Sequence, residues 1–253
     1  MTQVPSATRT LRVLRFLASQ PDPVPLDRII RACELPRSTA YHLLNAMIEQ
    51  GFVVHLTDEH RYGLGVAAFE VGSGYSRQAP LQRLARRPLA ALVDRIGQSA
   101  HLAVLHGRDV LYVVEERAPG RPPLVTDVGV RLPAHLTASG RAILAGLPGA
   151  QVRALYASSG DFVDRHGVGP RTLGALRTLL ADTRQRGYAQ EDGEVTPGLA
   201  SVAAAVFDHN RHPVAGVAVT FADGDPARIS REVRRTAAGL TRRIGGSPPS
   251  SPA

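Results

Sequence analysis

The 253-residue sequence contains one cysteine, no lysine and no tryptophan. The single thiol, Cys33, cannot form an intrachain disulfide, and it excludes a structural zinc site built from several thiolates. Apolar runs are short, such as VAAAVF at 202–207, whereas a membrane-spanning helix needs roughly 18 apolar residues. Arginines interrupt the apolar part of the first twenty residues, unlike a secretory signal. These absences predict a cytoplasmic protein that does not cross a membrane.

The composition is that of a globular protein, with 43% apolar and 21% charged residues. The length leaves room for two domains of about 100 to 150 residues each. All 30 basic residues are arginine, and the formal charge of +8 suits a polyanion such as nucleic acid. Residues 1–80 nevertheless hold eight arginines against seven acids, so the positive excess lies mainly further along the chain. A DNA contact near the N-terminus must therefore depend on where individual side chains are placed.

Three stretches near the N-terminus have the apolar spacing of amphipathic helices: 7–19, a run after the break PDPVP, and a run from Pro36 to Gly51. Ser6 is a plausible N-cap of the first. The apolar residues expected to face the core are Leu11, Leu14, Leu17, Ala18, Leu26, Ile29, Ile30, Cys33, Ala40, Leu43, Leu44, Met47 and Ile48. Residues 52–64 read as two short strands around a polar turn, so a β-hairpin should follow the helices.

Three helices and a hairpin are the parts of a winged helix-turn-helix, in which the third helix enters the major groove of DNA. The polar side of that helix carries groups that can reach bases and phosphates, since arginine pairs with guanine and asparagine with adenine. The residues expected to contact DNA are Arg37, Ser38, Thr39, His42, Asn45, His60 and Arg61. The alternative is a small helical cap whose polar face is only solvated.

Beyond residue 100 the pattern changes to short runs rich in valine and leucine, bounded by glycine, proline or charged turns, as strands are. The expected strands are AHLAVL, DVLYVVEE, PPLVTDV, SVAAAVF and PVAGVAVTF, and helical runs lie near 139–147, 172–186 and 227–244. The fold class is therefore α+β. The expected parts are a DNA-binding domain at 1–65, a linker helix at 66–80, a sheet-centred domain at 81–245 and a disordered tail at 246–253.

The segment LPRSTAYHLLNAMIEQGFVV, followed by RYGLG, resembles the recognition helix and wing of IclR-type bacterial transcription regulators. HLTASGRAILAGLP at 135–148 and GYAQEDGEVTPGLASVAAAVFDHNRHPVAGVAVTF at 187–221 resemble two further segments of the same family, so the likeness covers roughly 7–244. It implies a GAF-like effector-binding domain that senses a small organic molecule, often a carboxylate. It also implies DNA binding as a dimer or dimer of dimers. No cofactor is expected.

Position by position, the resemblance implies effector contacts from Ala138, Ser139, Glu191, Leu199, Ser201, Ala218 and Thr220. Asp192 and Glu194 lie close enough in sequence to contribute. Several family members have aspartate at the position of Glu191, cysteine at that of Ser201 and a hydroxyl at that of Ala218, so the ligand of this chain can differ in size and polarity. Thr137 and Ser139 precede a helix, where they can bind a carboxylate, or where one of them can simply be an N-cap.

Two other classes of function remain as alternatives. The first is an enzyme acting on a small acid in the second domain, although the sequence has no Gly-x-Ser-x-Gly elbow, phosphate loop or dinucleotide motif. The second is a DNA-binding protein of purely architectural function. A metal site formed by His101, His106 or His135 with nearby acids has no ligand spacing to support it, so no metal is expected.

Overall fold

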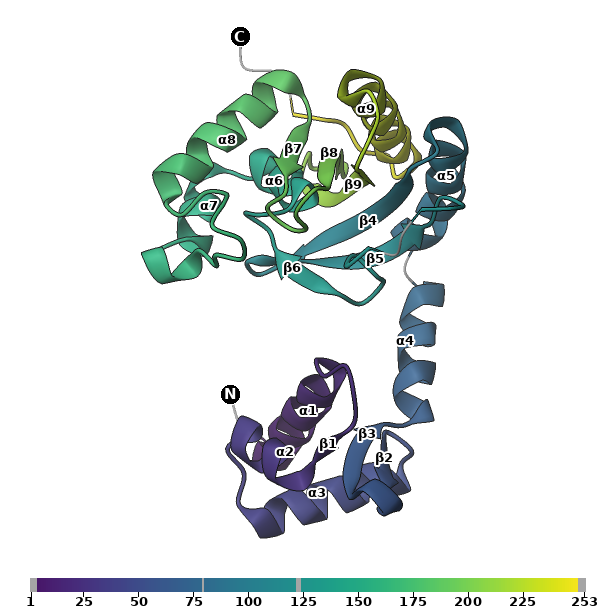
Figure 1. Ribbon diagram of the computed structural model, residues 1–253, viewed down its shortest axis with the longest axis vertical. Helices are drawn as coiled ribbons and strands as arrows, with labels where there is room; N and C mark the ends of the chain where they lie inside the picture. The colour runs from purple at the N-terminus through teal and green to yellow at the C-terminus, as the bar shows by residue number, and fades with distance from the viewer. Residues whose placement is uncertain (1–3, 79, 122–123, 250–253) are drawn as a thin grey trace. The chain divides into compact units, whose positions relative to one another are not determined.

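The computed structural model describes residues 4–78, 80–121 and 124–249, and the chain divides into two compact units, residues 1–79 and 80–253 (Figure 1). Unit 1 contains α1 (Pro5–Ala18), β1 (Val24–Pro25), α2 (Leu26–Cys33), α3 (Arg37–Glu49), β2 (Val53–Leu56), the 3-10 turn η1 (Thr57–Glu59), β3 (Arg61–Leu64) and α4 (Val66–Gln78). Three helices and an antiparallel sheet of order β1-β3-β2 form the expected winged helix-turn-helix.

The core of unit 1 is one apolar cluster between its helices and its sheet. Ile29, Cys33 and Leu44 are fully buried in it, as their helical spacing predicts. A Cβ on Gly65 would lie 2.9 Å from the carbonyl carbon of Gly51, so the chain passes close to itself where the hairpin returns toward α4. That close approach fixes the start of α4 against the chain that follows α3.

The apolar face of α1 is rotated relative to the sequence prediction. Val13 and Leu17 are buried, whereas Leu11 is 61% exposed and Ala18 is also exposed. Ser6 is not the N-cap, because Pro5 begins the helix and no side chain caps it. A proline is well suited to this first position, since its missing N–H would have no intrahelical partner there.

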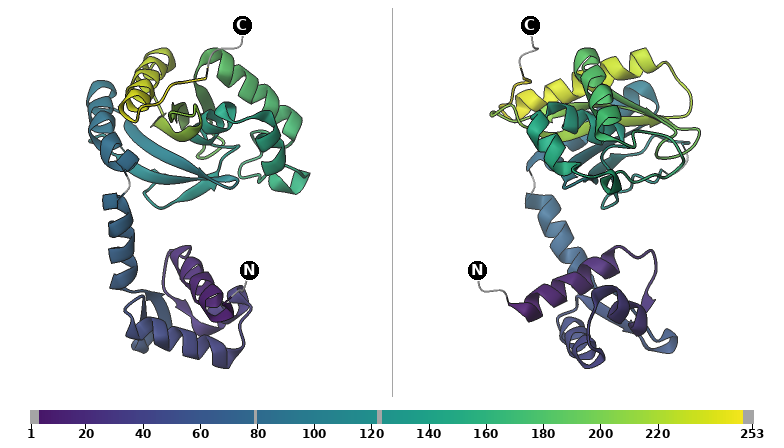
Figure 2. Two further views of the ribbon diagram at one scale, coloured as in Figure 1. Left: turned by 180° about the vertical axis from the view of Figure 1, so that it is seen from behind. Right: turned by 90° about the vertical axis from the view of Figure 1, so that its left-hand side faces the viewer.

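Unit 2 is built around a six-stranded antiparallel sheet of order β6-β5-β4-β9-β8-β7. Its elements are α5 (Pro80–Ile96), β4 (Ser99–His106), β5 (Asp109–Glu116), β6 (Arg131–Pro133), α6 (Ala138–Gly146), α7 (Gly149–Leu155), the 3-10 turn η2 (Ser159–Asp161), α8 (Leu173–Arg186), β7 (Ala189–Asp192), β8 (Ala200–Phe207), β9 (Pro213–Phe221) and α9 (Pro226–Arg243). Helices α5 and α9 cover one face of the sheet, and α6, α7 and α8 lie on the other (Figures 1 and 2). The α+β fold class is confirmed.

The strands separate two kinds of side chain onto the two faces. On β8 and β9, valines such as Val202 and Val217 face α5 and α9. Small residues, including Ala203 and Ala218, face α6. A Cβ on Gly216 would lie 2.9 Å from the carbonyl oxygen of Ser139, so α6 lies directly against the sheet. The start of α6 is thereby held at the sheet surface.

The expected strand PPLVTDV is wrong where the structure describes it, because residues 124–128 pair with no other strand. Pro122 and Pro123 lie outside the described residues. Strands β6 and β7 and helix α7 are additional to the sequence prediction. Beyond α9, the N–H of Gly246 donates to the carbonyl of Thr241 (2.8 Å) and that of Ser247 to Asp208 (3.3 Å), and residues 250–253 lie outside the described residues.

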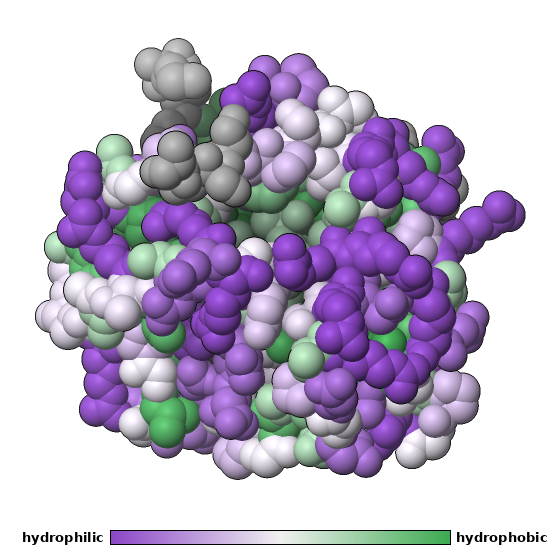
Figure 3. Space-filling model, turned by 90° about the horizontal axis from the view of Figure 1, so that it is seen from above, coloured by the Kyte–Doolittle hydropathy of each residue, from purple (hydrophilic) through white to green (hydrophobic). Residues whose placement is uncertain are grey.

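No helix within the described ranges has the length and apolar character that would let it cross a membrane. On the side of the molecule shown in Figure 3, hydrophilic side chains cover most of the surface and apolar areas are small and scattered.

Candidate functional site

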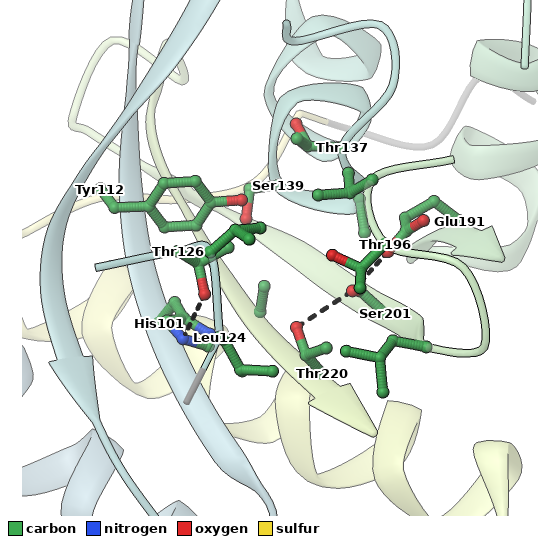
Figure 4. Close-up of a pocket in the computed structure, with 15 residues that line it drawn as sticks. His101, Tyr112, Leu124, Thr126, Thr137, Ser139, Glu191, Thr196, Ser201 and Thr220 are labelled. Carbon is green, nitrogen blue, oxygen red and sulfur yellow. Dashed lines mark hydrogen bonds between the residues drawn. The ribbon is translucent and has the colours of Figure 1, made fainter. Parts of the chain in front are cut away.

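A pocket in unit 2 lies between the start of α6 and the sheet face beneath it, and the segments after β5 and β7 complete its wall (Figure 4). The side chains that line it come from segments far apart in sequence: His101, Tyr112, Leu124, Val125, Thr126, Thr137, Ala138, Ser139, Glu191, Val195, Thr196, Leu199, Ser201, Ala218 and Thr220. The cavity in this pocket is only about 20 Å³, room for a water molecule. An organic ligand would therefore have to move part of the wall.

The start of α6 presents hydrogen-bond donors to this pocket. Thr137 is the N-cap, and its hydroxyl accepts from the N–H of Gly140 (3.0 Å). Within the described part of the chain, the N–H groups of Ala138 and Ser139 donate to nothing, and the buried hydroxyl of Ser139 has no partner. Unpaired N–H groups at a helix start, together with the helix dipole, favour a negatively charged group.

Three polar side chains form a hydrogen-bonded row across β7, β8 and β9. The register places Glu191 opposite Ser201 and Ser201 opposite Thr220. The Ser201 hydroxyl lies 2.6 Å from Oε1 of Glu191 and 3.0 Å from Oγ1 of Thr220 (Figure 4). The other carboxyl oxygen of Glu191, Oε2, is buried and finds no partner among the described residues.

The Glu191 carboxyl group is in an unusual electrostatic environment. It is 3% exposed, and this burial is the main reason why its pKa is raised to about 7. The nearby carboxylate of Glu194 raises the pKa further, whereas the hydrogen bond from Ser201 opposes the shift. Near neutral pH the group can therefore be either a hydrogen-bond donor or an acceptor toward a ligand.

A second polar chain fastens the segment after β5 to the sheet. The Thr126 hydroxyl lies 2.8 Å from Nε2 of His101, and that nitrogen lies 3.8 Å from the Glu115 carboxylate. Arg117 pairs with both Glu115 (3.0 Å) and Asp127. The nearby His101 ring, followed by the Arg117 guanidinium, holds the pKa of the Glu115 carboxyl well below its usual range. Residues 126–127, part of the pocket wall and its continuation, are thus held by these side-chain contacts and by the hydrogen bond from the N–H of Val130 to the carbonyl of Asp127 (3.0 Å), with no strand pairing.

No arginine is present among the lining residues that the structure describes. Arg141, one turn into α6, is fully buried but points its guanidinium at the carbonyls of His135 and Gln190 and at the carboxylate of Glu194, each at 2.8 Å. It therefore ties α6 to the segment after β7. Any anion in the pocket would be held by backbone N–H groups and hydroxyls.

The structure brings together seven of the eight residues expected at the effector site: Ala138, Ser139, Glu191, Leu199, Ser201, Ala218 and Thr220. Asp192 is exposed at the end of β7 and does not line the pocket. Sequence reasoning missed His101, Tyr112 and Thr126. The histidine could have been found from strand alternation, since it shares the α6 side of β4 with Ala103, whereas the segment holding Thr126 was taken for a strand.

The three candidate metal ligands are not gathered in one place. His101 contacts Thr126, His106 contacts Arg131 (2.8 Å) and His135 contacts the carbonyl of Val163 (3.0 Å). Each imidazole therefore has a separate protein partner.

In unit 1, the residues expected on the DNA-facing side of α3 are accessible. Ser38, His42 and Asn45 are exposed, and Thr39 is half-buried. Arg37 lies at the start of the helix, where its guanidinium is 2.8 Å from the Asp27 carboxylate and 5.9 Å from the ring centre of Tyr41. Both members of the ion pair are mostly solvent-exposed, so the pairing leaves Arg37 available to another partner.

The hairpin places the remaining candidates at its turn. His60 adopts a left-handed conformation (φ 52°) there and is exposed. Arg61 is exposed too, but its guanidinium donates to the carbonyl of Pro23 (3.0 Å), which ties the hairpin to the chain before α2. His55 stacks on Tyr62 with ring centres 4.4 Å apart. His60 is thus the freer of the two wing candidates.

Comparison with known proteins assigns both units to one family. The family model for the IclR helix-turn-helix domain matches residues 6–56, and that for the C-terminal part of bacterial transcriptional regulator IclR matches residues 74–244. The transcriptional repressor IclR of Escherichia coli is 32% identical over 220 residues, which cover 86% of this chain and 80% of that protein. The glycerol operon regulatory protein of Streptomyces coelicolor is 33% identical over 229 residues, covering 90% and 88%.

A solved structure has the same fold. It is an IclR homologue from Microbacterium hydrocarbonoxydans in complex with 4-hydroxybenzoate, with a TM-score of 0.82 and 22% identity over 96% of this chain and all of that one. The family-model matches cover most of the sequence and both compact units. The chain therefore belongs to the IclR family of bacterial transcription regulators.

Proposed function

We propose that this protein binds an operator through α3 and the hairpin of unit 1 and changes its DNA occupancy when a small organic molecule enters the pocket of unit 2. The observation that carries the proposal is the pocket, whose lining residues contain three buried polar atoms without partners in the described residues: Oγ of Ser139, Oε2 of Glu191 and Nδ1 of His101. Unpaired buried polar groups cost free energy, so they favour a ligand that would pair with them.

The proposed effector is a small carboxylic acid. Its carboxylate would bind the free N–H groups and hydroxyl at the start of α6, and the Glu191–Ser201–Thr220 row would contact a polar group at its other end. The 4-hydroxybenzoate in the Microbacterium structure, an acid with a polar substituent opposite its carboxylate, supports this class. Because arginine is absent from the described lining, the expected affinity is moderate and sensitive to the ligand's charge.

Ligand entry would act by shifting a population of conformations. A cavity of about 20 Å³ cannot hold an organic acid, so the ligand binds only the fraction of molecules in which the wall has opened. The segment at 124–127 is a candidate for that movement, since side chains and one local backbone hydrogen bond, and not strand pairing, hold it. For regulation, the opening of the pocket wall would also have to change how strongly unit 1 binds DNA.

The protein would bind DNA as a dimer or a dimer of dimers. Helix-turn-helix dimers read two half-sites separated by about one helical turn or a multiple of it, so a palindromic operator is expected.

The test is binding of the full-length protein to the DNA flanking its own gene, at physiological salt with excess nonspecific competitor, followed by a screen of small carboxylic acids for a change in that binding. Specific binding that a small acid alters supports the proposal. Specific binding that no acid alters would favour the architectural function, and chemical turnover of a bound acid would favour the enzyme.

A further inference from the structure

The positive charge of the chain is concentrated on two helices that the proposed function does not use. Helices α5 and α9 together carry ten arginines and two acids, Asp94 and Glu232. All ten arginines are exposed: Arg83, Arg86, Arg87, Arg95, Arg228, Arg231, Arg234, Arg235, Arg242 and Arg243. The ten arginines and two acids give these two helices a net charge of +8, which equals the formal charge of the whole chain. The charges of all other residues therefore cancel.

Part of this charge gathers in a groove between the two helices. Four arginines line it, together with Pro88, Ala91, Thr236 and Gly239: Arg87, Arg95, Arg235 and Arg243. The helices are fastened to each other beside it, because Arg95 pairs with Glu232 on α9 (2.7 Å) and accepts from Arg228 through its carbonyl (2.9 Å). The groove is therefore a fixed feature of unit 2.

The acids in the region do not neutralise the groove. Glu232 is shared by Arg95 and Arg235, at 2.7 Å from each. Arg87 and Arg243 form no ion pair with any side chain in the described ranges. Like charges this close repel one another, since the screening length at physiological salt is about 8 Å. A bound polyanion would relieve that repulsion.

The chemistry of the surface favours phosphate as the partner group. Guanidinium groups bind phosphate oxygens in bidentate geometry, and no lysine contributes to this surface. Apolar areas are small and scattered on the side of the molecule shown in Figure 3, so that side offers no broad apolar face for a protein partner. A sequence-independent contact with a nucleic-acid backbone needs no base-reading groups, and this groove has none beyond its arginines and Thr236.

We propose that the α5/α9 face, defined by these ten arginines, is a second DNA-contacting surface that binds the phosphate backbone of duplex DNA outside the operator contacts of unit 1. The proposal rests on the proposed function, because DNA bound by unit 1 supplies duplex at high effective concentration to the attached unit 2. The surface would add affinity and salt sensitivity, and no sequence preference.

The test compares full-length variants on a long random-sequence duplex over a range of salt concentrations. Arg87→Gln/Arg243→Gln removes two groove charges that have no ion-pair partner. The matched control, Arg153→Gln/Arg177→Gln, removes two exposed charges from α7 and α8 on the other face of the sheet. Thermal unfolding of both variants checks that they remain folded.

In the groove variant the negative slope of log K against log salt should become shallower by about 0.9 for each lost phosphate contact, and the control should leave the slope unchanged. For two contacts, the wild type should lose about tenfold more affinity than the groove variant between roughly 50 and 200 mM salt. Equal slopes for all three proteins would overturn the proposal. That result is also expected if the groove binds an acidic protein and not DNA. Equal reductions in both variants would also overturn it, since they would show a bulk charge effect.

The wild type is assayed in parallel on the DNA flanking its own gene. Failure to prefer that fragment would count against the regulator function, whereas the slope comparison on random duplex would still decide the role of the α5/α9 face.

Discussion

The carboxyl group of Glu191 loses nearly all its solvation when the protein folds, and this has a consequence for stability. Its pKa, ordinarily 4.5, is raised to about 7 mainly by burial. The folded state therefore holds the proton more tightly than the unfolded chain does. The contribution of this group to the free energy of unfolding is full below about pH 4.5 and is lost as the pH rises through about 7.

Glu191→Gln should remove that pH dependence. Between about pH 5 and pH 8 the wild type should lose up to about 3 kcal/mol relative to the variant, at about 1.4 kcal/mol for each pKa unit. Urea unfolding at the two pH values measures the difference. Asp182→Asn, at an exposed position on α8, is the control and should follow the wild type. If the free energy of unfolding falls equally in the wild type and in Glu191→Gln, the Glu191 carboxyl group is not the source of the pH dependence.

Arg37 is the residue of unit 1 whose substitution distinguishes base reading from phosphate contact. If it pairs with a base, Arg37→Ala should weaken binding to the specific operator by about 1 to 3 kcal/mol and relax the preference at one base pair. Competition assays with operator variants measure this. Arg28→Ala, an exposed arginine on α2, provides the comparison. A uniform loss across all sequences would instead make Arg37 a phosphate contact.

At the level of elements, α6 is the helix on which the pocket depends, and Gly140 sets its position. A Cβ on Gly140 would overlap the backbone of Ala134, so the start of the helix would have to move away from the segment that joins β6 to α6. In α8, a Cβ on Gly174 would meet nothing closer than 3.8 Å. The two glycines thus form a natural pair for comparison.

Gly140→Ala should destabilise the protein by several kcal/mol, because the clash is with backbone that cannot rotate away. Gly174→Ala should be neutral or stabilising by up to about 1 kcal/mol, since alanine restricts the unfolded chain and favours helix. Thermal or urea unfolding of both variants gives the comparison. Equal stability of the two would mean that α6 can shift without cost, and that the pocket is not held by this contact.

Elements with strong periodicity could be predicted from the sequence, and short edge elements could not. Helices α2 and α3 carry clear apolar spacing, and the structure has them where the pattern predicts. Strand β6 has three residues, and β7 reads AQED, so their pairing comes from the neighbouring strand and not from an alternating pattern. The run at 124–128 has the composition of a strand, yet its side chains line the pocket and contact His101.

Some of the pocket residues could likewise be predicted from the sequence, and others could not. Resemblance to a family supplied Ser139, Ser201 and Thr220, whose positions come from aligned motifs. Tyr112 and Thr126 come from segments outside those motifs and meet the pocket only because β5 and the chain after it turn toward α6. Tertiary proximity of this kind leaves no periodic signal in the sequence.

For the whole molecule, regulation requires that a change in the pocket of unit 2 reach the DNA contacts of unit 1. The two units have separate cores, so a substitution confined to the pocket should leave DNA binding itself intact. Loss of ligand response without loss of DNA binding is the property that separates a coupled regulator from an architectural protein.

Ser139→Ala/Thr220→Val removes two pocket hydroxyls while nearly preserving side-chain volume, so the fold should be retained. Because a hydrogen bond to a charged group contributes about 1.5 to 3 kcal/mol, the acid concentration needed for half-maximal response should rise at least tenfold. DNA affinity without ligand should be unchanged. Thr178→Ala, on the exposed face of α8, is the control and should respond like the wild type. Simultaneous loss of DNA binding and ligand response would contradict separate sites, and an unaltered response would place the effector elsewhere in the protein.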